Sequence, residues 1–103
     1  MLLAISISPS GSPRDDSETG GVSASVAKAI RVIRDSGLPN ETNAMFTNIE
    51  GEWDEVMAVV KKAVDVVAEV APRVGLVLKA DIRPGFADQL TAKVERVDRL
   101  LEG

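Results

Sequence analysis

The change of apolar period at Gly51 constrains the fold of this chain more than any other feature. Before it, Phe46 to Ile49 are β-prone residues. After it, apolar side chains recur about every 3.6 residues as far as Ala71. A glycine between two such patterns marks an abrupt turn, so the sequence predicts a short strand that passes within a few residues into the longest helix.

Carboxylates on the two sides of this turn have different interpretations. Glu52, Asp54 and Glu55 lie in the expected first helical turn, where unpaired backbone N–H groups and the helix dipole favour negative charge. Their presence therefore needs no ligand. Glu50 comes earlier, at the end of the strand, and a carboxylate in that place is available to a ligand.

Apolar patterns on either side of the turn predict the remaining elements. Leu2 to Ser8 and Arg73 to Ile82 alternate as strands do, whereas Val22 to Ser36 has the helical period. Glu41 to Glu50 holds two short strands that meet near residues 43–45, and a tail helix carries Leu90, Val94, Val97 and Leu101. This order is the split βαβ arrangement of the α+β ferredoxin-like fold, with a four-stranded antiparallel sheet and an extra C-terminal helix. We expect residues 1–103 to form a single domain.

Right-handed crossovers would place both long helices on one face of this sheet, which leaves the other face bare. That face is either a binding surface or merely solvated, and the sequence leaves both possibilities open. Its expected polar side chains are Ser6 and Ser8 from the first strand, Lys79 and Asp81 from the last, and either Asn48 and Glu50 or, in the other register, Thr47.

Three segments have competing interpretations. Ser23 or Ser25 can cap the first helix, and capping is favoured over ligand contact alone for Ser23. Trp53 lies in register with the apolar stripe, which favours core packing over a stacking platform. Residues 9–21 are rich in turn formers and lack the lysine-plus-hydroxyl ending of a phosphate-binding loop, so we interpret them as a connection.

Composition excludes several classes of function. The chain has no cysteine and no histidine, so thiol nucleophiles, the commonest metal ligand and the commonest general base are absent. A net charge of −4, with two phenylalanines, one tryptophan and no tyrosine, argues against nucleic acid. No apolar run approaches a membrane span. We therefore expect a cytoplasmic protein without a metal site.

The chain resembles the family of small thiamine-binding proteins. The residues that carry the resemblance are Ser8-Pro9 with Gly11, Val22-Ser23 before Val26-Ala27, Ser36-Gly37-Leu38, Asn43, Met45, the run from Thr47 to Trp53, then Lys79, Asp81 and Arg83, and Lys93, Val94 and Val97 in the tail. The resemblance implies a ferredoxin-like fold and assembly through the sheets into a homodimer or homotetramer. It also implies non-catalytic binding of thiamine or its hydroxymethylpyrimidine part, in salvage or transport, with no cofactor.

The resemblance also suggests site residues. Glu50 is the expected partner of the aminopyrimidine, whose ring nitrogen and exocyclic amine a carboxyl group can bridge. Neutral hydrogen-bonding groups are expected from Thr47, Asn43 and Ser23, with Ser8 near the mouth. Asp81 would either meet the thiazolium cation or pair with Lys79 or Arg83. The chain departs from the family pattern in its long acidic loop over residues 10–20 and in Ser25, where an aromatic residue is common.

Two other functions fit the same fold. A ferredoxin-like domain with a glycine-rich first loop also resembles amino-acid-binding regulatory domains, and fold alone does not separate these. A purely structural oligomeric unit, with the polar sheet face as its interface, is the third hypothesis.

Overall fold

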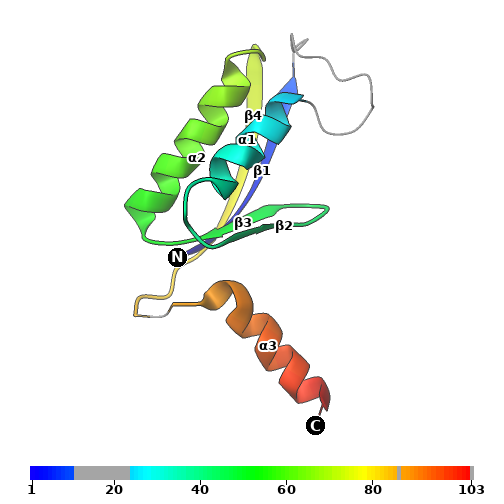
Figure 1. The fold of residues 1–103 in the computed structure, drawn as a ribbon, viewed down its shortest axis with the longest axis vertical. Helices are drawn as coiled ribbons and strands as arrows, with labels where there is room; N and C mark the ends of the chain where they lie inside the picture. Colours follow the sequence, from blue (N-terminus) through cyan, green and yellow to red (C-terminus); the bar gives the residue numbers. More distant parts are fainter. Residues whose placement is uncertain (11–23, 86, 103) are drawn as a thin grey trace.

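The computed structural model describes residues 1–10, 24–85 and 87–102. Four strands, β1 (Leu2–Ser10), β2 (Asn40–Thr42), β3 (Thr47–Glu50) and β4 (Arg73–Asp81), form one antiparallel sheet in the order β2-β3-β1-β4. The helices are α1 (Ala24–Arg34), α2 (Trp53–Ala68) and α3 (Gln89–Glu102) (Figure 1). This order confirms the ferredoxin-like fold with its additional helix.

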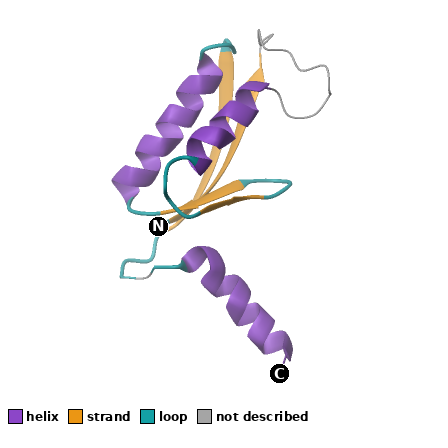
Figure 2. Cartoon of the chain, viewed as in Figure 1, coloured by secondary structure: helices purple, strands orange, loops and turns teal. Residues whose placement is uncertain are grey.

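The core lies between the sheet and the two helices α1 and α2, which cover the same face (Figure 2). The strands contribute large β-branched and leucine side chains, and the helices contribute one apolar side each. The buried apolar residues are Leu3, Ile5, Ile49, Ala29, Ile33, Val56, Val60, Ala63, Val67 and Ala71. Helix α2 therefore uses the stripe that its periodicity predicted. In α1 the buried line runs through Ser25, Ala29 and Ile33, while Val26 and Ile30 of the expected stripe are half-buried.

The turn at Gly51 is as tight as the sequence indicated. A Cβ atom at Gly51 would come 3.1 Å from Cγ2 of Val56 and 3.4 Å from the Leu38 side chain. Helix α2 then begins after Glu52, whose backbone N–H donates to Oε1 of Glu55 at 3.2 Å. A side chain at position 51 would therefore press against the Val56 side chain, which would have to move by a few tenths of an ångström.

Strand register determines which side chains share a face. Leu2 pairs with Glu50 and Asp81, and Ala4 pairs with Asn48 and Lys79. Because Leu3 and Ile5 face the core, the alternate residues Leu2 and Ala4 face away from the helices, and so do the cross-strand partners of Leu2 and Ala4. The open face therefore carries Asn48, Glu50, Lys79 and Asp81, whereas Thr47, opposite Ile5, points to the helix side. This register resolves the choice that the sequence left open.

The interpretation of Trp53 as a core residue was wrong. Its side chain is 55% exposed and lines a hollow with Met1, Ile82 and Pro84. Trp53 is the first residue of α2, and burial on this side of the helix begins one turn later at Val56. Periodicity identifies the apolar side of a helix but not the point along it at which the core ends.

Helix α3 differs from the other two because none of its residues is buried. Figure 1 shows it running away from the sheet and from both covering helices. The Cα radius of gyration is 15.3 Å, against about 13 Å for a compact domain of 100 residues. Asp88, just before α3, has a φ of 57°. None of the helices in the described part of the chain is long and apolar enough to cross a membrane.

Candidate functional site

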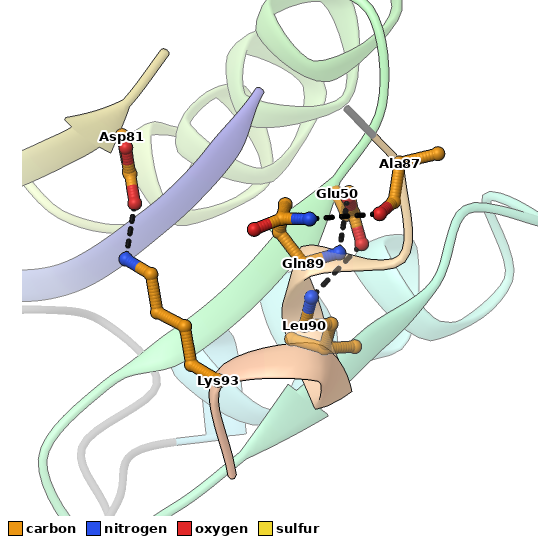
Figure 3. A network of polar contacts seen from close by, with 6 residues as sticks. All are labelled: Glu50, Asp81, Ala87, Gln89, Leu90 and Lys93. Carbon is orange, nitrogen blue, oxygen red and sulfur yellow. Dashed lines mark hydrogen bonds and ion pairs between the residues drawn. The ribbon is translucent and has the colours of Figure 1, made fainter. Parts of the chain in front are cut away.

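Glu50 is 7% exposed, and its carboxylate holds the start of α3. The backbone N–H of Gln89 donates to Oε2 at 2.8 Å, and that of Leu90 donates to Oε1 at 3.0 Å (Figure 3). The first amides of a helix have no partner within it and lie at the positive end of its dipole. A strand residue therefore caps a helix 39 positions later. Both oxygens that were expected to meet a ligand are engaged.

Asp81 also contacts α3. Nζ of Lys93 donates to Oδ2 of Asp81, and the two form an ion pair on the open face (Figure 3). The hydrogen bond and the charge of Lys93 lower the pKa of Asp81 below its ordinary value of 3.8, and Arg83 and Lys79 lower it further. The sequence had suggested Lys79 or Arg83 as the partner of Asp81. The salt bridge instead comes from Lys93, which no local spacing connects to Asp81.

We call these two contacts the α3 anchor: Glu50 with the amides of Gln89 and Leu90, and Asp81 with Lys93. The two carboxylates expected to contact a ligand thus accept hydrogen bonds from groups of the same chain.

Beside the anchor lies the open-face hollow, with a volume of about 350 Å³. Its lining residues are Leu2, Ala4, Asn48, Lys79, Ala80, Asp81 and Lys93. Asn48 donates from Nδ2 to Oε1 of Glu41 at 3.1 Å. Most of its polar groups are therefore charged or already hydrogen-bonded.

A second hollow, the α1 hollow, lies on the helix side of the sheet and has a volume of about 210 Å³. Apolar side chains of β1, α1 and the β2–β3 turn make most of its wall. Its lining residues are Ile5, Ser6, Ile7, Val26, Ala29, Ile30, Ile33, Thr42, Asn43, Ala44, Met45, Phe46 and Thr47. A few polar groups among apolar walls are typical of a small-molecule site.

Two threonines supply hydroxyl groups in the α1 hollow. Thr47 is buried, and its Oγ1 lies 3.3 Å from Oγ1 of Thr42 on the neighbouring strand. A hydroxyl group donates one hydrogen bond and accepts others, so this pair can serve a ligand with either kind of polar edge. Thr42 was not singled out from the sequence, although its place opposite Thr47 follows from the hairpin register.

Asn43 shapes the turn that closes the same hollow. Its Oδ1 accepts hydrogen bonds from the backbone N–H groups of Met45 and Phe46, each at 2.9 Å. This is the way in which asparagine stabilises turns. Asn43 is thus a lining residue of the hollow whose side chain also fixes the turn.

The five described residues among the six expected to bind a ligand do not converge in one chain. Asn43 and Thr47 line the α1 hollow, while Asp81 lines the open-face hollow with Glu50 nearby. Ser8 pairs with Gly75, toward the far end of β1. Ser23 lies outside the described residues.

Comparison with known proteins was made for sequence and for structure. The model of the thiamine-binding protein family matches residues 3–98. A UPF0045 protein of Mycobacterium tuberculosis is 54% identical over 102 residues, which covers 98% of this chain and 94% of the relative. A Bacillus cereus domain of unknown function superposes with a TM-score of 0.78 at 29% identity, over 92% of this chain and 86% of that domain. A Thermotoga maritima protein assigned provisionally to thiamine biosynthesis or salvage has a TM-score of 0.73 at 26% identity, over 93% and 96% of the two chains.

Proposed function

Because this chain belongs to the family of thiamine-binding proteins, we propose that it binds thiamine, or the hydroxymethylpyrimidine part of thiamine, without transforming it. The observation that carries the proposal is the α1 hollow, where Thr42, Asn43 and Thr47 lie among apolar walls. A flat pyrimidine ring buries its faces against such walls and uses its nitrogen atoms at the polar edge.

Size favours the pyrimidine part as the group that enters. The volume of about 210 Å³ is below the roughly 300 Å³ at the lower end of sites for drug-sized ligands. One substituted ring would fill the hollow, and the thiazolium of intact thiamine would then lie outside it. The exposed Met45 in the β2–β3 turn is placed to cover an outer ring.

A different location for the same ligand follows from the expected role of Glu50. An aminopyrimidine bridged by the Glu50 carboxylate would have to replace the amides of Gln89 and Leu90. It would also lose access to Thr47, which is on the other side of the sheet. We therefore propose the α1 hollow as the binding site and assign Glu50 to the α3 anchor.

Thermal unfolding with hydroxymethylpyrimidine, thiamine and thiamine phosphates tests the function. Ligand at a hundred times its dissociation constant stabilises the native state by about 2.7 kcal/mol, which for a domain of this size raises Tm by on the order of 10 °C. Replacing the buried hydroxyl in Thr47→Val should remove most of the shift. The matched control is Thr91→Val on the exposed α3, which should keep it.

The variants also separate the two locations. A shift lost in Asp81→Asn or Glu50→Gln but kept in Thr47→Val would contradict binding in the α1 hollow. The absence of a shift with every thiamine-related ligand would overturn the function, and a shift with amino acids instead would favour an effector-sensing domain. Unfolding without ligand should accompany each variant, so that lost stability is not mistaken for lost binding.

We propose further that the chain acts in the cytoplasm, in thiamine salvage or transport, as a homodimer or homotetramer. The support is the family and the provisional assignment of the Thermotoga maritima relative. Light scattering over a dilution series measures the number of subunits.

A further inference from the structure

The start of α2 and the segment after β4 enclose a hollow of about 180 Å³. We call it the Trp53 hollow, and its walls are Met1, Glu52, Trp53, Ile82, Arg83 and the Pro84-Gly85 turn. Figure 1 shows the N-terminus, the start of α2 and the segment after β4 at the same end of the sheet. In the described part of the chain, none of these residues lines the α1 hollow or the open-face hollow. The Trp53 hollow is therefore a separate concave surface, to which the proposed function gives no role.

Two large apolar side chains of this hollow are left in water. Trp53 is 55% exposed and Ile82 is 59% exposed. They come from different walls, because Trp53 begins α2 and Ile82 follows β4. Tryptophan buries a large area when it is covered, and exposed apolar side chains that line a concave surface are typical of a binding site. An apolar group between the two side chains would remove both from water.

The two charged side chains of the hollow have opposite sign. Glu52 precedes Trp53 and Arg83 follows Ile82, so each apolar side chain has one charged neighbour in the sequence. The guanidinium of an arginine pairs with a carboxylate through two parallel hydrogen bonds. A carboxylate has about four acceptor positions, so Glu52 can accept from an ammonium group while it serves the first turn of α2. The hollow thus matches a ligand that carries both charges.

The walls of the hollow are fixed by contacts and backbone preferences within the chain. The backbone N–H of Gly51 donates to the carbonyl oxygen of Met1 at 3.1 Å, which ties the start of β1 to the turn before α2. On the other wall, Pro84 has a restricted φ and Gly85 has a φ of 83°, a pair of residues that favours a tight turn. A site whose walls are already in place loses little conformational entropy when it binds a ligand.

We propose that the Trp53 hollow binds a free α-amino acid with an apolar side chain. The carboxylate of the amino acid pairs with Arg83, its ammonium group pairs with Glu52, and its side chain lies between Trp53 and Ile82. The volume of about 180 Å³ is below the roughly 300 Å³ at the lower end of sites for drug-sized ligands, which suits a molecule with one small side chain. The inference goes beyond the proposed function and does not depend on it, because the two hollows are separate.

Trp53 is the only tryptophan of the chain, so its fluorescence reports directly on this hollow. L-leucine, which does not fluoresce, is titrated into the full-length protein, and the proposal expects a saturable change in emission. Leucine amide lacks the carboxylate charge and N-acetyl-leucine lacks the ammonium charge. Each should bind at least about tenfold more weakly, because each loses one charge-assisted hydrogen bond. These blocked ligands test both charges without altering the protein.

Substitutions test the same contacts from the side of the protein. Arg83→Gln and Glu52→Gln should each weaken the binding of L-leucine at least about tenfold. Arg73→Gln and Asp54→Asn are the matched controls and should keep the affinity, because both residues are exposed and neither lines the hollow. Thr47→Val, which alters the α1 hollow, should also keep the affinity. Thermal unfolding without ligand shows whether each variant is folded.

Several results would contradict an amino-acid site in the Trp53 hollow. The absence of both an emission change and a thermal shift with L-leucine would overturn it. Equal binding of N-acetyl-leucine and L-leucine would mean that the ammonium group is not recognised. Unchanged affinity in Arg83→Gln and Glu52→Gln, or a response lost in Thr47→Val, would place the amino acid elsewhere. A chain that binds L-leucine in this way but no thiamine-related ligand would overturn the proposed function and support this inference.

Discussion

Helices α2 and α3 are both amphipathic, but only α2 has its apolar side covered. Val56, Val60, Ala63 and Val67 of α2 are buried against the sheet, whereas α3 has no buried residue. Each helix begins beside a glutamate: Glu55 serves α2 from within its own first turn, and Glu50 serves α3 from a strand. Helix α2 is therefore held by the packing of its apolar side. Helix α3 is held by polar contacts at its own first turns.

The largest expected effect contrasts the two stripes directly. Val60→Asp in α2 puts an unpaired charge into the core and should destabilise the chain by more than about 4 kcal/mol. Val97→Asp in α3 should change the stability of a single copy by less than about 0.5 kcal/mol, because Val97 is exposed. Urea unfolding at low protein concentration measures both. Equal losses would show that α3 belongs to the core after all.

The next effect concerns the anchor. Glu50→Gln replaces a charged acceptor of two backbone hydrogen bonds with a neutral group, which should weaken the hold on α3 by about 2 kcal/mol. Hydrogen exchange at the amides of Gln89 and Leu90 should accelerate roughly thirtyfold. Amides in the middle of α2 should change much less. Unchanged exchange at position 89 would contradict the capping role of Glu50.

A smaller effect is expected where a helix supplies its own cap. Glu55→Ala removes the acceptor of the Glu52 N–H and should destabilise the chain by about 0.5–1 kcal/mol. Glu95→Ala, on the outer side of α3, is the control and should be close to neutral. A loss as large as that expected for Val60→Asp would mean that the first turn of α2 does more than cap.

The smallest effect is the pH dependence of the second anchor contact. The pKa of Asp81 is lowered in the folded chain, chiefly by Lys93, so its contribution is present above the ordinary pKa of 3.8 and is lost as pH falls through the lower folded value. NMR titration of Asp81 should show the lowered pKa, and Lys93→Gln should raise it toward 3.8. If Lys93→Gln left the pKa of Asp81 unchanged, the contact between Asp81 and Lys93 would not be part of the α3 anchor.

Periodicity and turn chemistry were sufficient to predict the fold. The alternation in β1 and β4, the stripe of α2 and the turn at Gly51 all act over short distances in sequence. Topology then follows from general rules of connection. These signals are local, and the structure agrees with them.

The site was less predictable because its contacts are long-range. The sequence showed that Glu50 ends a strand, but nothing near it indicates that Gln89 and Leu90 return to its carboxylate. The face of Thr47 depended on register, which a shift of one residue reverses. Trp53 lies on the apolar side of α2, as its spacing predicted, but at a point along the helix that the core does not reach.

Asp88 has a further consequence through its backbone. A left-handed conformation is uncommon outside glycine, although aspartate tolerates it better than most residues, and here it sets the exit direction of the last helix. Glycine at this position would relieve local strain and widen the range of exit directions. The same exchange would leave the direction of α3 less well defined in a single copy, because the backbone before the helix could adopt more conformations.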